Sequence, residues 1–99
     1  MYLIREIMCC KPGKVRPLVE KFLAMAKLTE KSGMGRMRVM TDVTAERYWT
    51  LVAEMEVESL DSFMSMDMPE DDTKEFDRIM KGYHDLVDYG RREIYKIES

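Results

Sequence analysis

The segment from Met37 to Val57 constrains the fold more than any other part of this sequence. Two runs rich in Val, Thr, Tyr, Trp and Met flank a short polar break at Thr44-Ala45-Glu46. Beta-branched and aromatic residues favour strands, and a three-residue break between two such runs is typical of a β-hairpin loop. We therefore predict a pair of antiparallel strands in the middle of the chain, against which the other segments pack.

Pairing Val43 with Arg47 across this loop sorts the hairpin into two faces, because side chains alternate along a strand. The first face is a continuous apolar row that favours a core position for Trp49, and its pairs are Thr41 with Trp49, Val39 with Leu51, and Met37 with Ala53. The second face is mixed, and its pairs are Arg36 with Glu54, Arg38 with Val52, Met40 with Thr50, and Asp42 with Tyr48. A bulge at the loop would shift this register.

Strand and helix patterns alternate before the hairpin. Tyr2 to Cys10 is predicted to be a strand, and its apolar residues point to both sides, which is typical of a central strand. Lys14 to Lys31 is predicted to be a helix, because its apolar residues recur at three- and four-residue spacing and Gly33 supplies a stop.

A second helical region follows the hairpin and is interrupted. Ser59 is its predicted N-cap, and Pro69 breaks it because proline disfavours helix in the residue before it. One of the two aspartates in Glu70–Asp72 is expected to cap the next helix, which ends at Gly90, and a calcium loop is disfavoured because its spaced ligands are absent. Arg91 to Ile97 is predicted to be the last strand.

The predicted order is therefore β-α-β-β-α-β in a single domain of residues 1–99. This is an α+β, ferredoxin-like plan, with a four-stranded antiparallel sheet and both helices on one face. Right-handed crossovers place the first and third strands in the middle. The uncovered face of mixed polarity predicts a homodimer, in which two sheets enclose a lumen lined by polar and methionine side chains.

Composition excludes several classes of function. A net charge of −3 argues against nucleic-acid binding, and no apolar run approaches the length of a membrane span. The N-terminal segment reads as a strand without a secretory pattern, so we expect a cytoplasmic protein. Cys9 and Cys10 are expected to be free structural thiols, with a metal or redox pair as the alternative. We expect no metal and no cofactor.

The strand order and the ending Tyr83 to Ile97 resemble the dimeric α/β-barrel proteins of ferredoxin-like fold, and in particular their small uncharacterised NIPSNAP-like branch. That group includes cofactor-free monooxygenases, haem degraders, isomerases, ligand-sensing domains and members of no known activity. The resemblance implies the fold and a homodimer, and it implies no particular activity. Haem degraders of the group use an Asn on the first strand, and this sequence has no Asn.

Candidate catalytic residues are few. His84 is the only histidine and would be the natural acid or base, although a partly exposed helix histidine near Asp88 explains it equally simply. Glu6 lies on a strand predicted to be central, so it should pair with Arg38, Arg91 or Arg92, or have a raised pKa in the lumen. One of Arg91 and Arg92 is expected to form an ion pair across the dimer.

Candidate ligand-binding residues lie on the mixed face of the hairpin, and they are Arg36, Arg38, Glu54 and Tyr48. A cross-strand salt bridge is the structural alternative for the charged residues of this set. The function expected from these observations is small-molecule binding in the barrel lumen without a catalytic signature. The alternative is a cofactor-independent monooxygenase or isomerase that acts on a small aromatic or anionic substrate.

Overall fold

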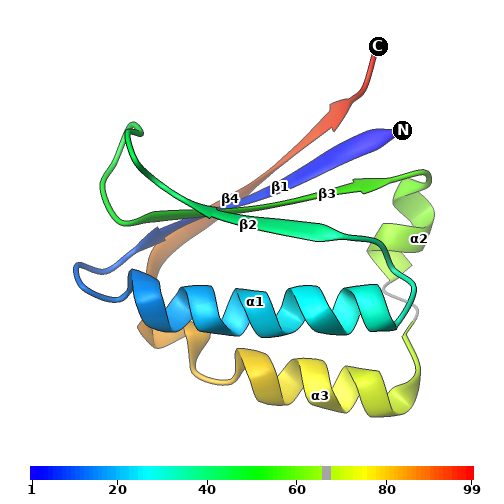
Figure 1. The fold of residues 1–99 in the computed structure, drawn as a ribbon, viewed down its shortest axis with the longest axis horizontal. Helices are drawn as coiled ribbons and strands as arrows, with labels where there is room; N and C mark the ends of the chain where they lie inside the picture. The colour runs from blue at the N-terminus through cyan, green and yellow to red at the C-terminus, as the bar shows by residue number, and fades with distance from the viewer. Residues whose placement is uncertain (66–67) are drawn as a thin grey trace.

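The computed structural model describes residues 1–65 and 68–99 and shows a four-stranded sheet with helices on one side (Figure 1). The elements are β1 (Tyr2–Cys10), α1 (Val15–Lys31), β2 (Met37–Thr41), β3 (Thr50–Val57), α2 (Leu60–Ser65), α3 (Glu70–Met80), a 3₁₀ turn η1 (Tyr83–Asp85) and β4 (Val87–Lys96). All neighbouring strands are antiparallel, in the order β2-β3-β1-β4. The predicted ferredoxin-like fold, with β1 and β3 in the middle, is confirmed.

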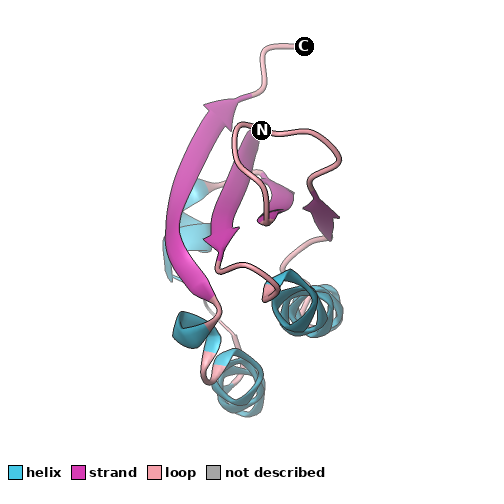
Figure 2. Cartoon of the chain, turned by 90° about the vertical axis from the view of Figure 1, so that its left-hand side faces the viewer, coloured by secondary structure: helices cyan, strands magenta, loops and turns pink. Residues whose placement is uncertain are grey.

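The hydrophobic core lies between the sheet and α1. Leu18 and Phe22 of α1 and Leu51 of β3 are the largest of its buried side chains, and Cys10 and Ala53 pack with them. Burial of these apolar groups supplies most of the stabilisation of a fold of this size. Figure 2 shows α1 and α3 on the same side of the curved sheet, and no helix within residues 1–65 and 68–99 covers the other side. Arg47, from the segment between β2 and β3, lies over Tyr89 of β4 on that side. We call this helix-free side the open face.

The hairpin register differs from the predicted one by two residues. Met37 lies opposite Met55 and Thr41 opposite Leu51, so the loop spans residues 42–49 instead of three residues. Asp42 and Thr50 close the loop, because a side-chain oxygen of Asp42 accepts the Thr50 N–H at 2.8 Å and the Asp42 N–H donates to the Thr50 carbonyl at 3.1 Å. A shift of two residues keeps each side chain on its predicted face.

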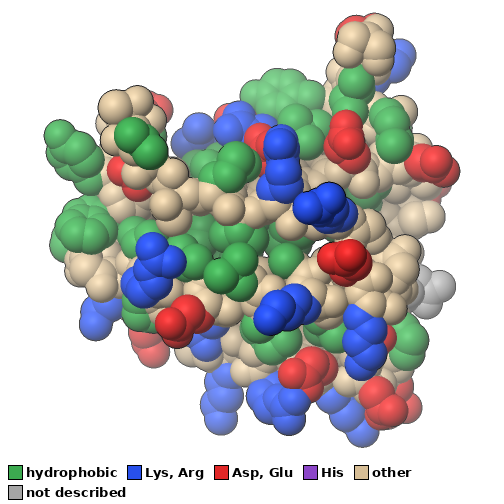
Figure 3. Space-filling model, viewed as in Figure 1, with side chains coloured by type: hydrophobic (Ala, Val, Ile, Leu, Met, Phe, Trp, Pro, Cys, Tyr) green, Lys and Arg blue, Asp and Glu red, His purple; other side chains and the backbone are tan. Residues whose placement is uncertain are grey.

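The longer loop removes Trp49 from the apolar row in which the sequence placed it. Trp49 adopts a left-handed backbone conformation with φ of 64° and is 44% exposed, so the core assignment is wrong. Val43 and Tyr48 are also exposed in this loop. Figure 3 shows hydrophobic side chains gathered at the end of the molecule that carries the β2–β3 loop, whereas charges of both signs are interspersed over α1 and α3.

The C-terminal third also departs from prediction at both ends of its helix. Pro69, and neither aspartate of Glu70–Asp72, occupies the N-cap position of α3. The helix ends at Met80 and Gly82 follows in a left-handed conformation, whereas the helix was predicted to end at Gly90. β4 therefore begins four residues earlier than the predicted strand.

Gly90 lies within β4, opposite Met8 of β1. A Cβ at Gly90 would lie 2.6 Å from the Met8 sulfur, so this glycine permits close packing and ends no helix. The predicted Ser59 cap is confirmed by the Ser62 N–H, which donates to the Ser59 hydroxyl at 3.3 Å. Within residues 1–65 and 68–99, no helix combines the length and apolarity that a membrane span requires.

Candidate ligand-binding site

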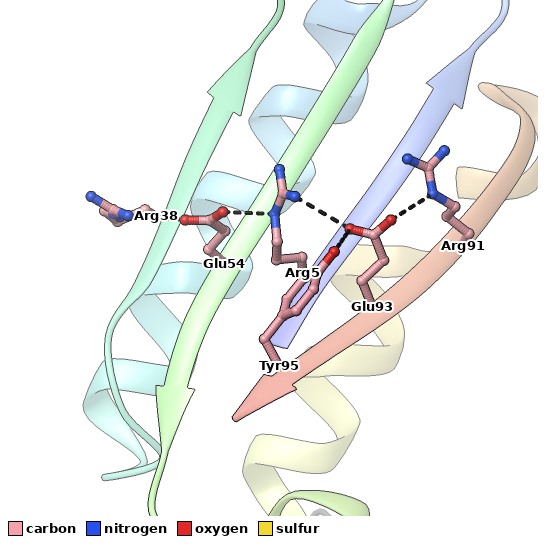
Figure 4. A network of polar contacts seen from close by, with 6 residues as sticks. All are labelled: Arg5, Arg38, Glu54, Arg91, Glu93 and Tyr95. Carbon is pink, nitrogen blue, oxygen red and sulfur yellow. Dashed lines mark hydrogen bonds and ion pairs between the residues drawn. The ribbon is translucent and has the colours of Figure 1, made fainter. Parts of the chain in front are cut away.

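The open face carries a network of charges that runs across all four strands (Figure 4). Glu54 of β3 lies between Arg38 of β2, at 2.9 Å, and Arg5 of β1, at 2.8 Å. The Arg5 contact is an ion pair in which the Nε–H is not aligned on the carboxylate oxygen. Arg5 also reaches Glu93 of β4 at 3.2 Å, and Glu93 accepts a hydrogen bond from Arg91 at 3.1 Å. The carboxylates of this network therefore each contact two arginines.

Two groups of this network, Glu93 and Arg91, have shifted pKa values. Hydrogen bonds from Arg91 and from the Tyr95 hydroxyl hold the pKa of Glu93 below its ordinary value of 4.5. The same hydrogen bond raises the pKa of Arg91. The arginines are thus occupied by carboxylates of the same chain, which favours the salt-bridge alternative for the hairpin charges.

The four candidate ligand-binding residues do not converge on one point. The structure brings Arg38 and Glu54 together as a cross-strand pair, in direct register. Arg36 precedes β2 and is exposed, and within the described residues it forms no ion pair. Tyr48 is 84% exposed in the 42–49 loop, where it lines an open hollow with Trp49 and Arg16.

A partly open cavity of about 240 Å³ lies on the opposite side of the sheet, between the strands and the helices. We call it the inner cavity. Its apolar lining is rich in methionine and aromatic side chains, and these are Met8, Met25, Met34, Met37, Met55, Met80, Phe22, Phe63, Phe76 and Tyr83. Methionine is flexible and polarisable, so such a lining adapts to ligands of different shape.

One end of the inner cavity is polar. Glu6 of β1 lies in register with Arg92 of β4, and Arg92 Nε–H donates to the Glu6 carboxylate. The Arg92 guanidinium also lies over the Phe63 ring of α2, 5.1 Å from its centroid. The prediction that Glu6 pairs with an arginine is confirmed for Arg92, and both partners line the cavity.

A second space of about 380 Å³, which we call the outer hollow, adjoins this polar end. His84 lines it, with its ring centroid 4.0 Å from that of Tyr83. Glu6 and Arg92 line both spaces, whereas His84 belongs to the outer hollow alone. The structure therefore brings the two candidate catalytic residues, Glu6 and His84, to one region.

The sequence did not identify Arg92 or Phe63 as cavity residues. Because side chains alternate along β4, Arg91 lies on the open face and Arg92 on the helix side. The sequence could not assign these sides, because the predicted strand began only at Arg91 and its pairing with β1 was not established. The predicted break in the helix at Pro69 did not indicate that Phe63 would contact Arg92 of β4.

The two cysteines are buried and free. Burial raises the pKa of the Cys10 thiol, which packs in the core beneath α1. Within residues 1–65 and 68–99, no group of three or more His, Cys, Asp or Glu side chains is placed to hold a metal ion.

Comparison with known proteins identifies the fold. No protein-family model and no curated protein sequence matches this chain. Its structure resembles an uncharacterized NIPSNAP domain protein from Burkholderia xenovorans, with a TM-score of 0.74 and 7% identity over 100% of this chain and 96% of that one. A NIPSNAP-like domain protein of the same organism gives a TM-score of 0.73 and 16% identity, over 99% and 85% of the two chains.

A third similar structure belongs to a protein of known chemistry. It is a mutant of SnoaB, a cofactor-independent oxygenase from Streptomyces nogalater, with a TM-score of 0.70 and 10% identity over 99% of this chain and 93% of that one. Identities this low establish architecture and carry no activity to this chain. The chain therefore has the ferredoxin-like fold of the NIPSNAP-like and monooxygenase-like proteins, as its C-terminal resemblance predicted.

Proposed function

We propose that this protein binds a small, largely apolar molecule in the inner cavity. The observation that supports the proposal is the cavity itself, which is lined mainly by methionine and aromatic side chains and carries a few polar groups, among them the Glu6–Arg92 pair. Small-molecule sites are mostly apolar, with a few polar groups that fix the orientation of the ligand. The cavity lies on the helix side of the sheet, and a lumen between two sheets, which the sequence led us to expect, would be a separate space.

We also propose that two copies pair through their open faces to form a homodimer. Leu3, Val52 and Tyr95 contribute apolar surface to this face, on which Ile7 is already buried within the chain. The charges between them are already paired within the chain, so a second sheet could cover the face without leaving an unpaired charge. This pairing would leave the inner cavity of each protomer on the helix side.

Free thiols at Cys9 and Cys10 support a reducing compartment such as the cytoplasm.

An oxygenase or isomerase is the second candidate function. Glu6 supports it, because a carboxylate at the polar end of an apolar cavity is placed to accept a proton from a bound substrate. The similarity of fold to SnoaB raises the same possibility. Oxygen uptake with a naphthohydroquinone probe tests it. An enzyme should exceed the uncatalysed oxidation and lose that excess in Glu6→Gln, whereas a binding protein should not accelerate the reaction in either form.

A cavity-blocking variant tests the binding proposal. Met80→Trp would place a larger side chain in the inner cavity, and Met64→Trp makes the same change at a 64% exposed methionine of α2. Both variants and the wild type are screened by thermal shift against small aromatic molecules, after circular dichroism confirms folding. Ligands should stabilise the wild type and Met64→Trp and should lose their effect on Met80→Trp. Equal responses of the two variants would contradict the proposal.

A further inference from the structure

The inner cavity and the outer hollow are separated by a wall of a few side chains. Glu6, Met8, Tyr83 and Arg92 line both spaces, so the ion pair lies where the two spaces meet. An apolar molecule in the inner cavity would meet the Glu6–Arg92 pair at this wall. A polar group attached to that molecule would also face the outer hollow, which has a more polar lining that includes His84 and Asp88.

Arg92 is held in place by more than its carboxylate partner. Its side chain is 46% exposed, and the Phe63 ring supports the guanidinium from α2 through a cation–π contact. Glu6 accepts from the Nε–H, and within the described residues the guanidinium makes no other hydrogen bond. A guanidinium has five N–H donors, so its terminal nitrogens retain donors for an incoming anion.

The geometry points to a specific class of ligand, and this inference rests on the proposed function above. We propose that the ligand is a monocarboxylic acid with a compact apolar body, whose carboxylate binds the terminal nitrogens of Arg92 while the body fills the inner cavity. Planar arginine suits bidentate binding of a carboxylate. The volume of about 240 Å³ equals that of about eight waters at ~30 Å³ each, which suits a body the size of a phenylpropyl group.

Glu6 opposes the same ligand. Its carboxylate lies next to the bound anion and competes for the same guanidinium, so it lowers the affinity for acids compared with neutral molecules of the same shape. The pair thus sets the specificity of the cavity through two opposing charges. Removing either charge should change the preference for acids in opposite directions.

Two matched probes test the inference, namely 3-phenylpropanoate and 3-phenylpropanamide, which differ in charge and little in shape. Dissociation constants are measured by titration of ¹³C-methyl methionine signals in the wild type, Arg92→Gln, Glu6→Gln and Arg91→Gln. Arg91 is the matched control, because it neighbours Arg92 in the chain and borders the outer hollow, but its guanidinium donates to Glu93 on the open face. Arg92→Lys keeps the charge and replaces Arg92→Gln if the latter does not fold.

We expect Arg92→Gln to weaken binding of the acid about tenfold and that of the amide less than about twofold, the range for loss of a charge-assisted hydrogen bond. Arg92→Lys should weaken binding of the acid less than Arg92→Gln does, and Glu6→Gln should strengthen binding of the acid. Arg91→Gln should leave the dissociation constants of both probes unchanged. Equal effects of Arg92→Gln on acid and amide would overturn the inference and leave the binding function intact. Failure of both probes to shift any methionine of the inner cavity would contradict the proposed function as well.

Discussion

Replacement of Glu54 by Gln tests the network on the open face, because this carboxylate serves two arginines. The Glu54 side chain is 12% exposed, and its partners Arg5 and Arg38 are 33% and 70% exposed. Glutamine keeps the shape and removes the charge. Arg5 would then retain only Glu93 as an ionic partner within the described residues, at 3.2 Å.

The expected loss follows from these exposures. Removing one partner of a fully buried pair costs about 3–5 kcal/mol, whereas an exposed pair contributes about 0.2–1 kcal/mol. The Arg38 contact belongs to the exposed class, and the Arg5 contact lies between the two. We therefore expect Glu54→Gln to lower the free energy of unfolding by about 2 kcal/mol, or to lower Tm by roughly 10 °C in a chain of this length.

Urea unfolding followed by circular dichroism measures this loss, at two protein concentrations because a dimer would be stabilised at the higher one. Glu56→Gln is the matched control, since Glu56 lies on the same strand and the same face but is exposed. Its effect should stay within about 0.5 kcal/mol.

Double-mutant cycles then separate the two contacts. Coupling of Glu54 to Arg5 should exceed coupling to Arg38. Equal stability of Glu54→Gln and Glu56→Gln, or a larger coupling to Arg38, would refute the reasoning.

Three further predictions concern other parts of the fold. Gly90→Ala should lower the free energy of unfolding by about 1–3 kcal/mol, because the new methyl group meets the Met8 sulfur, and an unchanged urea midpoint would contradict this packing. The lowered pKa of Glu93 adds stability above pH 4.5 that is lost as pH falls through the lower folded value, so Glu93→Gln should flatten the acid limb of a stability-against-pH profile. Cys9 and Cys10 should react slowly with iodoacetamide in the native protein and rapidly in urea, and Cys9→Ala/Cys10→Ser should fold. A stoichiometric metal lost in that double variant would contradict a structural role.

The elements that could be predicted best are those with a long, regular spacing of apolar residues. β1 and α1 have long, regular apolar patterns, and their observed bounds agree with the predicted ones to within one residue. The hairpin was recognised, but its turn was placed by composition alone. The Asp42 side chain closes a longer loop there, and no propensity encodes that contact.

The site was less predictable than the fold because it depends on register. Arg91 and Arg92 are chemically identical neighbours, and only the start of β4 decides which one reaches Glu6. Either Gly82 or Gly90 could have followed the end of the helix, and the sequence did not distinguish them. In the structure Gly90 lies in β4 and packs against Met8. Pairing of Glu6 with an arginine could be predicted, since a carboxylate on a central strand needs a partner. The inner cavity could not, because it arises from the packing of separate elements.

The most direct test of the binding function uses the methionines as probes. Six methionines within residues 1–65 and 68–99 line the inner cavity, whereas Met1, Met40 and Met64 are exposed elsewhere and serve as internal controls. The protein is labelled with ¹³C-methyl methionine and titrated with a panel of small aromatic acids and their amides. Binding in the inner cavity predicts saturable shifts of the cavity methyl signals and constant control signals. Shifts confined to Met40 would place the ligand on the open face, and unchanged cavity signals throughout the panel would contradict the account.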